Sequence, residues 1–143
     1  MKVAKLFRWE AAHRLPWHEG QCRHLHGHSY RMFVELTGPA DERGLLVDFK
    51  ELKAWMRPLV AVWDHATIVD QRDEELLSVV RTHGWNHALL PYDSTAENLC
   101  RFAAEWLVEA QRDRLHSLGV TRVVTRIAET ETCYAEYEIE LPA

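Results

Sequence analysis

Long apolar runs and basic runs are both absent from this sequence. No segment approaches the roughly 18 consecutive apolar residues of a membrane helix, so no membrane partner is expected. Residues 1–10 lack the apolar stretch of a signal peptide, which favours a cytoplasmic location. Lysine and arginine number 17 against 22 aspartates and glutamates, and no basic run interleaves with aromatic residues. Nucleic-acid binding therefore has no support.

Cysteine is sparse as well. The sequence has three cysteines, an odd number, and in a cytoplasmic protein we expect free thiols rather than a disulfide framework. Internal repeats, low-complexity tracts and linkers are also lacking. With 143 residues, of which 47% are hydrophobic, the chain is expected to form one domain over residues 1–143.

Histidine, by contrast, is concentrated near the N-terminus. Five of the nine histidines lie close together in the sequence: His13, His18, His24, His26 and His28. Because neutral imidazole is the commonest metal ligand in proteins, this cluster is the first place to look for a metal site.

The pattern of apolar residues predicts two strands around this cluster. Apolar side chains recur with a period of two over residues 3–13, and the alternation returns over residues 26–36. Pro16 and Gly20 mark residues 14–25 as a loop. We therefore predict a strand, a loop and a second strand.

Helix signals follow. Asp48 with Glu51 three residues later is typical of a helix start, and apolar residues continue from there at helical spacing. Pro58 lies inside this pattern and is expected to kink the helix or to end it early. A second capping box, Ser94-Thr-Ala-Glu97, predicts another long helix with Ser94 at its N-terminus.

The remaining segments complete the predicted fold class. Residues 73–81 are expected to form a short helix and residues 85–90 a short extended segment. Two alternating runs, residues 120–130 and 134–141, predict a closing pair of strands. The order is ββααββ, so we predict an α+β domain with a four-stranded antiparallel sheet.

Three histidines are expected to meet at one end of the first two strands. His26 and His28 begin the second strand two residues apart, so both imidazoles lie on one face. If the strands pair antiparallel through the loop, His13 comes to lie opposite them. Three neutral imidazoles with an open fourth position is the arrangement of catalytic zinc. An isolated His-x-His is more often structural, and the third histidine is what favours a metal.

Other polar residues are candidates for catalysis. Cys22 lies in the loop that must fold over such a metal. A thiolate near a cation can act as a general base there. A purely structural role for this cysteine is an equally good interpretation. Asp64 can orient the adjacent His65, but the pair is a catalytic candidate only if the fold brings it close to Cys22. Glu129 and Glu131 close an apolar strand, where a carboxylate can accept two parallel hydrogen bonds from a heterocycle, although solvated glutamates are more usual there.

Six separated motifs run through the chain. They are Phe7-Arg-Trp-Glu-Ala-Ala-His-Arg-Leu-Pro16, Cys22-Arg-His-Leu-His-Gly-His-Ser-Tyr30, Gly44-Leu-Leu-Val-Asp-Phe-Lys-Glu-Leu-Lys53, Asp64-His65, Ser94-Thr-Ala-Glu-Asn98, and Glu129-Thr130 with Ala135-Glu-Tyr137. Together they resemble the 6-pyruvoyl-tetrahydropterin synthase family, in family order and over nearly the whole chain. The resemblance implies the tunnelling fold (T-fold), with helices on one face of a four-stranded sheet. It also implies a homohexamer, a dimer of trimers with active sites between subunits.

The resemblance assigns the metal site and the base. His13, His26 and His28 would hold Zn2+, and Cys22 would be the proton-abstracting base.

The resemblance also assigns the relay and the ring anchor. Asp64 and His65 would relay charge to the base. Glu129 rather than Glu131 would anchor the pterin ring, because the family's anchoring glutamate precedes a tyrosine by eight positions, as Glu129 precedes Tyr137.

The spacing of residues in the loop indicates which branch of the family this sequence resembles. Three residues separate Cys22 from His26, which is similar to the bacterial 6-carboxytetrahydropterin synthases of the queuosine route. This implies zinc-dependent conversion of 7,8-dihydroneopterin triphosphate to 6-carboxy-5,6,7,8-tetrahydropterin, with release of acetaldehyde and triphosphate. Arg14 and Arg23, the loop cations nearest the metal, are candidates for binding the triphosphate, although solvated arginines are the more usual reading.

Three alternatives stay open. The same scaffold could make 6-pyruvoyl-tetrahydropterin or cleave the sepiapterin side chain. A non-catalytic zinc- or pterin-binding paralogue is a second alternative, against which the joint presence of Cys22, Asp64 and His65 speaks. An unrelated zinc hydrolase is disfavoured because the sequence has no His-Glu-x-x-His motif.

Overall fold

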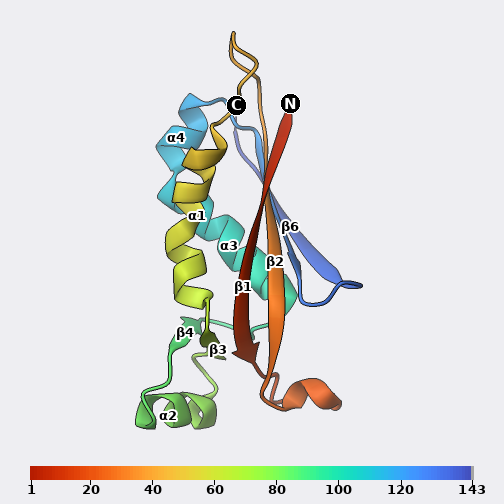
Figure 1. Cartoon of the computed structure of the whole chain (residues 1–143), viewed down its shortest axis with the longest axis vertical. Coiled ribbons are helices and arrows are strands. Elements are labelled where there is room, and N and C mark those ends of the chain that lie inside the picture. Colours follow the sequence, from red (N-terminus) through yellow and green to blue (C-terminus); the bar gives the residue numbers. More distant parts are fainter. Residues whose placement is uncertain (143) are drawn as a thin grey trace.

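Six strands form one mixed sheet in the computed structural model, which describes residues 1–142 (Figure 1). The strands stand in the order β4-β3-β1-β2-β5-β6. Strands β1, β2, β5 and β6 pair antiparallel, whereas β3 runs parallel to β1 and β4 parallel to β3. The strand bounds are Lys2–His13 (β1), His26–Thr37 (β2), Ala66–Asp70 (β3), His87–Leu90 (β4), Arg122–Ala128 (β5) and Tyr134–Glu140 (β6).

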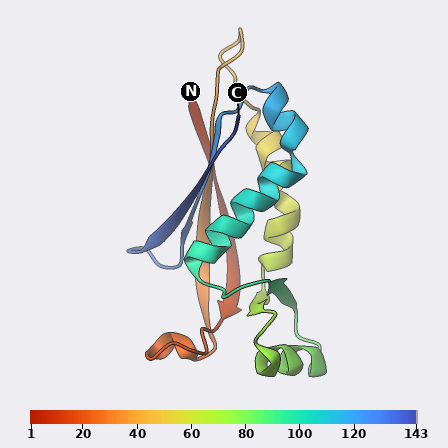
Figure 2. The same ribbon diagram turned by 180° about the vertical axis from the view of Figure 1, so that it is seen from behind.

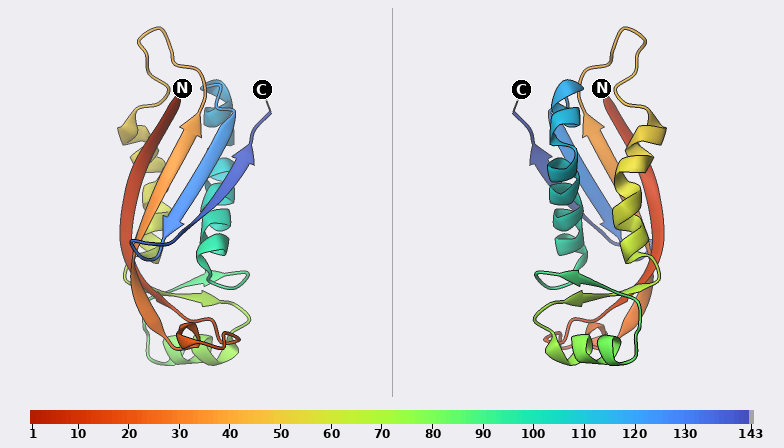
Figure 3. Two further views of the ribbon diagram at one scale, coloured as in Figure 1. Left: turned by 90° about the vertical axis from the view of Figure 1, so that its right-hand side faces the viewer. Right: turned by 90° about the vertical axis from the view of Figure 1, so that its left-hand side faces the viewer.

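The two long helices cover one face of the sheet (Figure 2 and Figure 3). Helix α1 packs on β1, and α3 packs on β5 and β6. The helix bounds are Phe49–Trp63 (α1), Glu74–Thr82 (α2), Ala96–Ala110 (α3) and Arg112–Ser117 (α4), with a 3₁₀ turn at Gln21–Arg23. No helix within residues 1–142 is long and apolar enough to span a bilayer.

The two longest strands of the sheet, β1 and β2, form a hairpin, and the histidine cluster lies at one end of it. Its register pairs Lys2 with Thr37 at one end and His13 with His26 at the other. Alternate side chains, such as the stacked Trp9 and Tyr30, are buried under the helices. The strands predicted at residues 3–13 and 26–36 are thus confirmed to within one residue at each end.

The four predicted strands pair antiparallel and the α+β class holds, but the prediction of a sheet of four strands was wrong, because two parallel strands extend it. The structure adds the parallel strands β3 and β4, so the order becomes β1, β2, α1, β3, α2, β4, α3, α4, β5, β6. All five residues of β3 are buried. A strand buried on both faces shows no alternation, so its sequence carried no period of two. Strand β4 lies within the segment predicted to be extended.

The expectation of an early end at Pro58 was also wrong. Helix α1 continues past Pro58 to Trp63. Proline removes one helical N–H donor. Both Pro58 and Ala54, four residues earlier, lie on the exposed face, so the unpaired carbonyl can reach water. On the other face, five buried side chains hold the helix against the sheet: Leu52, Trp55, Met56, Leu59 and Trp63.

Helix α3 begins one residue later than predicted. Its N-cap is Thr95, whose side chain accepts a hydrogen bond from the backbone N–H of Asn98 at 3.2 Å. Ser94, the predicted N-cap, is buried instead. The short helix α2 begins after Asp73, which caps it through the N–H of Leu76, in agreement with the predicted helix at residues 73–81.

Candidate active site and metal centre

Three imidazoles converge at the end of the β1–β2 hairpin. His13 is paired with His26, and His28 lies opposite Ala11, so all three rings project from the same face. Their candidate ligand atoms lie within 4.8 Å of one another. The predicted meeting of the three histidines is therefore observed, while their binding of zinc stays a prediction.

Main-chain carbonyls orient two of these rings. The Nδ1 atom of His13 lies 2.7 Å from the carbonyl oxygen of Ser94, and Nδ1 of His26 lies 2.6 Å from that of His24. A carbonyl can only accept, so each Nδ1 carries the proton and each Nε2 keeps a free lone pair. Metal-binding histidines are typically held in this way.

Two ring nitrogens at the centre have no protein partner. Nε2 of His13 and Nε2 of His28 are both buried and unpaired among the residues described. Buried polar atoms are normally satisfied, so two neighbouring unpartnered nitrogens call for a ligand. The donor set of three neutral imidazoles fits zinc with an open position.

The surroundings keep these imidazoles neutral. Burial lowers the pKa of His13 to about 4, against an opposing effect of its hydrogen bond to Ser94, and His26 and His28 lower it further. Burial also lowers the pKa of His28, with His26 adding to the effect. Since only the neutral ring binds a metal, the site favours the ligating form at neutral pH.

Glu129 lies beside the histidines at the end of β5. Its carboxylate oxygens are 3.8 Å from Nε2 of His13 and 3.8 Å from Nε2 of His28. Burial raises the pKa of Glu129, Glu97 raises it further, and His26 opposes them. The carboxylate is thus adjacent to the metal position, where it can accept hydrogen bonds from a bound ring.

Cys22 lies in the 3₁₀ turn of the loop between β1 and β2. It is a half-buried free thiol. The backbone N–H of Leu15 donates to the carbonyl of Cys22 at 2.8 Å, which closes the loop on itself. The structure therefore confirms that Cys22 lies in the loop that joins the two histidine-bearing strands, while its role as base stays a prediction.

Asp64 and His65 occupy a separate position, between the end of α1 and the start of β3. Oδ1 of Asp64 lies 2.9 Å from Nδ1 of His65 and accepts the backbone N–H of Glu10 at 3.0 Å. The φ angle of His65 is 55°, a left-handed conformation that costs about 1–3 kcal/mol in a residue other than glycine. The backbone N–H of His65 donates to the carbonyl of Glu10, and Asn86 donates to the carbonyl of His65.

Asp64 and His65 make no direct polar contact with Cys22 in the described part of the chain. No hydrogen bond or ion pair joins Cys22 to Asp64 or His65 in residues 1–142. The His65 side chain is 79% exposed. That the fold brings the pair to Cys22 therefore stays a prediction.

The two arginines predicted to bind triphosphate differ in their surroundings. Arg14 is held by Asp73 through two hydrogen bonds of 2.7 and 2.6 Å, and these raise its pKa. Arg23 has only a 3.4 Å contact with Nε2 of His24. Arg14 therefore fastens its loop to α2, and triphosphate binding by either residue stays a prediction.

Comparison with known proteins agrees with this geometry. A family model described as 6-pyruvoyl tetrahydropterin synthase matches residues 2–140. The chain belongs to the 6-pyruvoyl tetrahydropterin synthase family. Over 145 residues it is 30% identical to the 6-carboxy-5,6,7,8-tetrahydropterin synthase of Haemophilus influenzae, covering 96% of this chain and 98% of that protein. Over 163 residues it is 30% identical to the Aquifex aeolicus protein of the same name, covering 97% and 98%.

Solved structures of 6-pyruvoyl tetrahydropterin synthases share the fold. The Plasmodium falciparum structure matches with a TM-score of 0.79 at 18% identity, covering 99% of this chain and 98% of that one. The Caenorhabditis elegans structure matches with a TM-score of 0.69 at 24% identity, covering 98% and 96%. The tunnelling fold of these synthases is therefore the fold of this chain.

Several residues of this synthase-family site were not found from the sequence. Ser94 and His24 act through backbone carbonyls, which every residue type has, so no sequence pattern marks them. Trp17 and Asp93, joined by a 2.8 Å hydrogen bond, are 76 positions apart in the chain. Only the fold brings them together.

Proposed function

We propose that this chain converts 7,8-dihydroneopterin triphosphate and one water to 6-carboxy-5,6,7,8-tetrahydropterin, with release of acetaldehyde and triphosphate, in the queuosine/deazapurine route. The observation that carries the proposal is the pair of buried, unpartnered nitrogens of His13 and His28, which lies beside Glu129 at the base of the loop that bears Cys22. Near-full-length relatives named 6-carboxy-5,6,7,8-tetrahydropterin synthase support this choice of product.

The three histidines form the zinc-binding part of this proposal. His13, His26 and His28 would hold zinc through their Nε2 atoms. Zinc bound there supplies Lewis-acid chemistry that acidifies the side-chain hydroxyls of the substrate. The hydrogen bonds from Nδ1 of His13 and His26 to carbonyls keep the rings aimed at one point, so little reorganisation is needed on binding.

The other residues bind the ring and move protons. Glu129 accepts two parallel hydrogen bonds from N–H groups of the pterin ring, which fixes the ring next to the metal position. Sγ of Cys22 removes a proton from the side-chain carbon next to the ring. His65, oriented by Asp64, returns protons through Nε2, since its Nδ1 faces the carboxylate.

Product analysis with a Cys22 variant tests this assignment. The zinc-loaded protein is incubated with 7,8-dihydroneopterin triphosphate and the products are identified by mass. Cys22→Ala should lower turnover by about 10²–10⁴, the usual contribution of a positioned base, while zinc content stays unchanged. Cys133→Ala, which removes an exposed thiol, is the matched control and should retain turnover.

Three outcomes would contradict the assignment. A 6-pyruvoyl-tetrahydropterin product would show that the chain has the activity of the other branch of its family. Parent turnover in Cys22→Ala would make the thiol structural. Loss of zinc in that variant would make Cys22 a fourth ligand and the site a closed one, which favours the non-catalytic binding protein.

We propose further that the enzyme is a cytoplasmic homohexamer with active sites between subunits. Cys22 makes no hydrogen bond or ion pair with Asp64 or His65 within residues 1–142, which supports a relay supplied by a neighbouring subunit. Strands β4 and β6 are edges of the sheet, and such edges invite pairing between chains. Light scattering should give a hexamer, and a fully active monomer would contradict the proposal.

Mixed assemblies test the shared site directly. Cys22→Ala and His65→Ala subunits are each expected to be nearly inactive alone. If one subunit supplies Cys22 and its neighbour His65, refolding the two together should restore activity at some of the sites. Absence of any recovery, with mixed oligomers shown by mass, would place both residues in one chain.

A further inference from the structure

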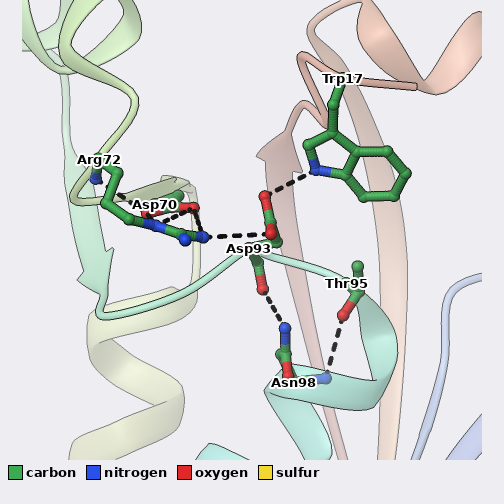
Figure 4. A network of polar contacts seen from close by, with 6 residues as sticks. All are labelled: Trp17, Asp70, Arg72, Asp93, Thr95 and Asn98. Carbon is green, nitrogen blue, oxygen red and sulfur yellow. Dashed lines mark hydrogen bonds and ion pairs between the residues drawn. The ribbon is translucent and has the colours of Figure 1, made fainter. Parts of the chain in front are cut away.

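Two side chains, Arg14 and Trp17, bind the loop that carries Cys22 to acidic residues elsewhere in the chain. At its base, Arg14 binds Asp73. Farther along, the indole N–H of Trp17 donates to Oδ1 of Asp93 at 2.8 Å (Figure 4). The Trp17 ring is 60% exposed, so burial contributes less to its position than it would in the core. The hydrogen bond to Asp93 is therefore the directional contact that fixes this part of the loop.

Asp93 is itself held on both sides. Its other carboxylate oxygen accepts from Arg72 at 3.2 Å, and Arg72 is held in turn by Asp70 (Figure 4). Its backbone carbonyl accepts from the side-chain amide of Asn98 at 2.9 Å, while the backbone N–H of Asn98 binds the Thr95 hydroxyl. Asp93 is thus anchored to the N-terminus of α3 and to the end of β3.

The residue after Asp93 orients a zinc ligand. The carbonyl of Ser94 accepts the Nδ1 proton of His13 at 2.7 Å, and Ser94 is 1% exposed. One short segment therefore contacts both the metal site and the loop that bears Cys22. Because Asp93 and Ser94 are adjacent in the chain, the two contacts share one short stretch of backbone.

We propose that Asp93 is a positioning residue, which holds the Cys22 loop through Trp17 at a fixed place relative to His13. The catalytic benefit rests on the proposed function, in which Cys22 is the base. The positioning itself is a property of the loop and is measured without turnover. A misplacement of about 1 Å at such a group can cost about 10²-fold in rate.

Trp17→Phe removes the indole donor and keeps an aromatic ring. Alkylation of Cys22 by iodoacetamide, followed by peptide mass analysis, should become roughly tenfold faster, the factor equivalent to one charge-assisted hydrogen bond. In the zinc-loaded protein kcat should fall by roughly tenfold or more with little change in KM. Zinc affinity should be unchanged, because Ser94 still orients His13.

The variants at Asp93 separate the hydrogen bond from general destabilisation. Asp93→Ala should reproduce the Trp17→Phe effects, and the double variant should be no worse than either single one, because both remove the same bond. Asp93→Asn keeps an oxygen acceptor for Trp17 and should restore most of the wild-type alkylation rate and kcat. Glu51→Ala, which breaks a bidentate surface pair with Arg114 on other elements, is the matched control and should change neither quantity.

The outcomes distinguish this proposal from the function on which it rests. Unchanged Cys22 alkylation in Trp17→Phe and Asp93→Ala, or multiplied effects in the double variant, would overturn the positioning role. Faster alkylation with undiminished turnover would instead support the positioning of the loop by Asp93. It would also show that Cys22 is not the base, because turnover would not depend on its position.

Discussion

The metal-free protein should lose stability sharply on mild acidification because of His13. The side chain is 2% exposed and its pKa is lowered to about 4, chiefly by burial. In the unfolded chain the pKa of histidine is about 6.5. The unfolded state therefore binds the proton first as the pH falls, and the stability present above pH 6.5 is lost progressively down to about pH 4.

The size of this loss follows from the two pKa values. The full shift corresponds to about 3 kcal/mol, at about 1.4 kcal/mol per pKa unit. Between about pH 8 and pH 5 the free energy of unfolding should fall by about 2 kcal/mol from this residue alone. Zinc should oppose the loss, because it binds only the neutral ring.

Urea unfolding of chelator-treated protein, at fixed concentration and at both pH values, measures the effect. His13→Gln cannot take up the proton, so its loss of stability between the two pH values should be smaller than that of the wild type by the same 2 kcal/mol, an order-of-magnitude figure. Equal pH dependence in the two proteins would refute the reasoning. Direct titration of the His13 ring by NMR near pH 6.5 would refute it as well.

Three further predictions concern other buried or paired groups. Thr125 is fully buried and its hydroxyl donates to the carbonyl of Cys100 at 2.7 Å, so Thr125→Val should lower the free energy of unfolding by about 1 kcal/mol in urea titrations. Arg14 holds the pKa of Asp73 below its usual range, so this stabilisation is present above about pH 4 and is lost as the pH falls further; the difference between wild type and Asp73→Asn should shrink in the same window. Glu129→Gln should raise KM at least about tenfold with zinc content unchanged, because an amide offers one acceptor oxygen to two N–H donors. An unchanged KM in that variant would remove Glu129 as the ring anchor.

The histidine cluster was predictable because its geometry is local. The two strands around it show a clear period of two, and a hairpin with a single connecting loop leaves little freedom in register. The sequence alone therefore predicts that His13 lies opposite His26 and His28. The helix starting after Asp48 was predictable for a similar reason, since N-caps depend on neighbours within one turn.

The middle of the chain was not predictable in this way. Strand β3 is buried on both faces and short, so its residues lack the alternation that marks an edge strand or a half-exposed strand. Pro58 carries a strong breaking signal, but burial of the opposite helix face outweighs one lost hydrogen bond. The N-cap of α3 is Thr95 and not the predicted Ser94, because Ser94 is buried against His13. Capping rules do not include such a tertiary contact.

The sequence by itself determined the four antiparallel strands, the long helices and the convergence of three imidazoles, because those depend on periodicity and short loops. Only the tertiary structure decided that the Ser94 carbonyl fixes the His13 ring, that Asp93 binds Trp17, and that Asp64 accepts the backbone N–H of Glu10. The physical reason is sequence separation: residues 54 to 81 positions apart meet only after the sheet has formed, and nothing in their local pattern records the contact.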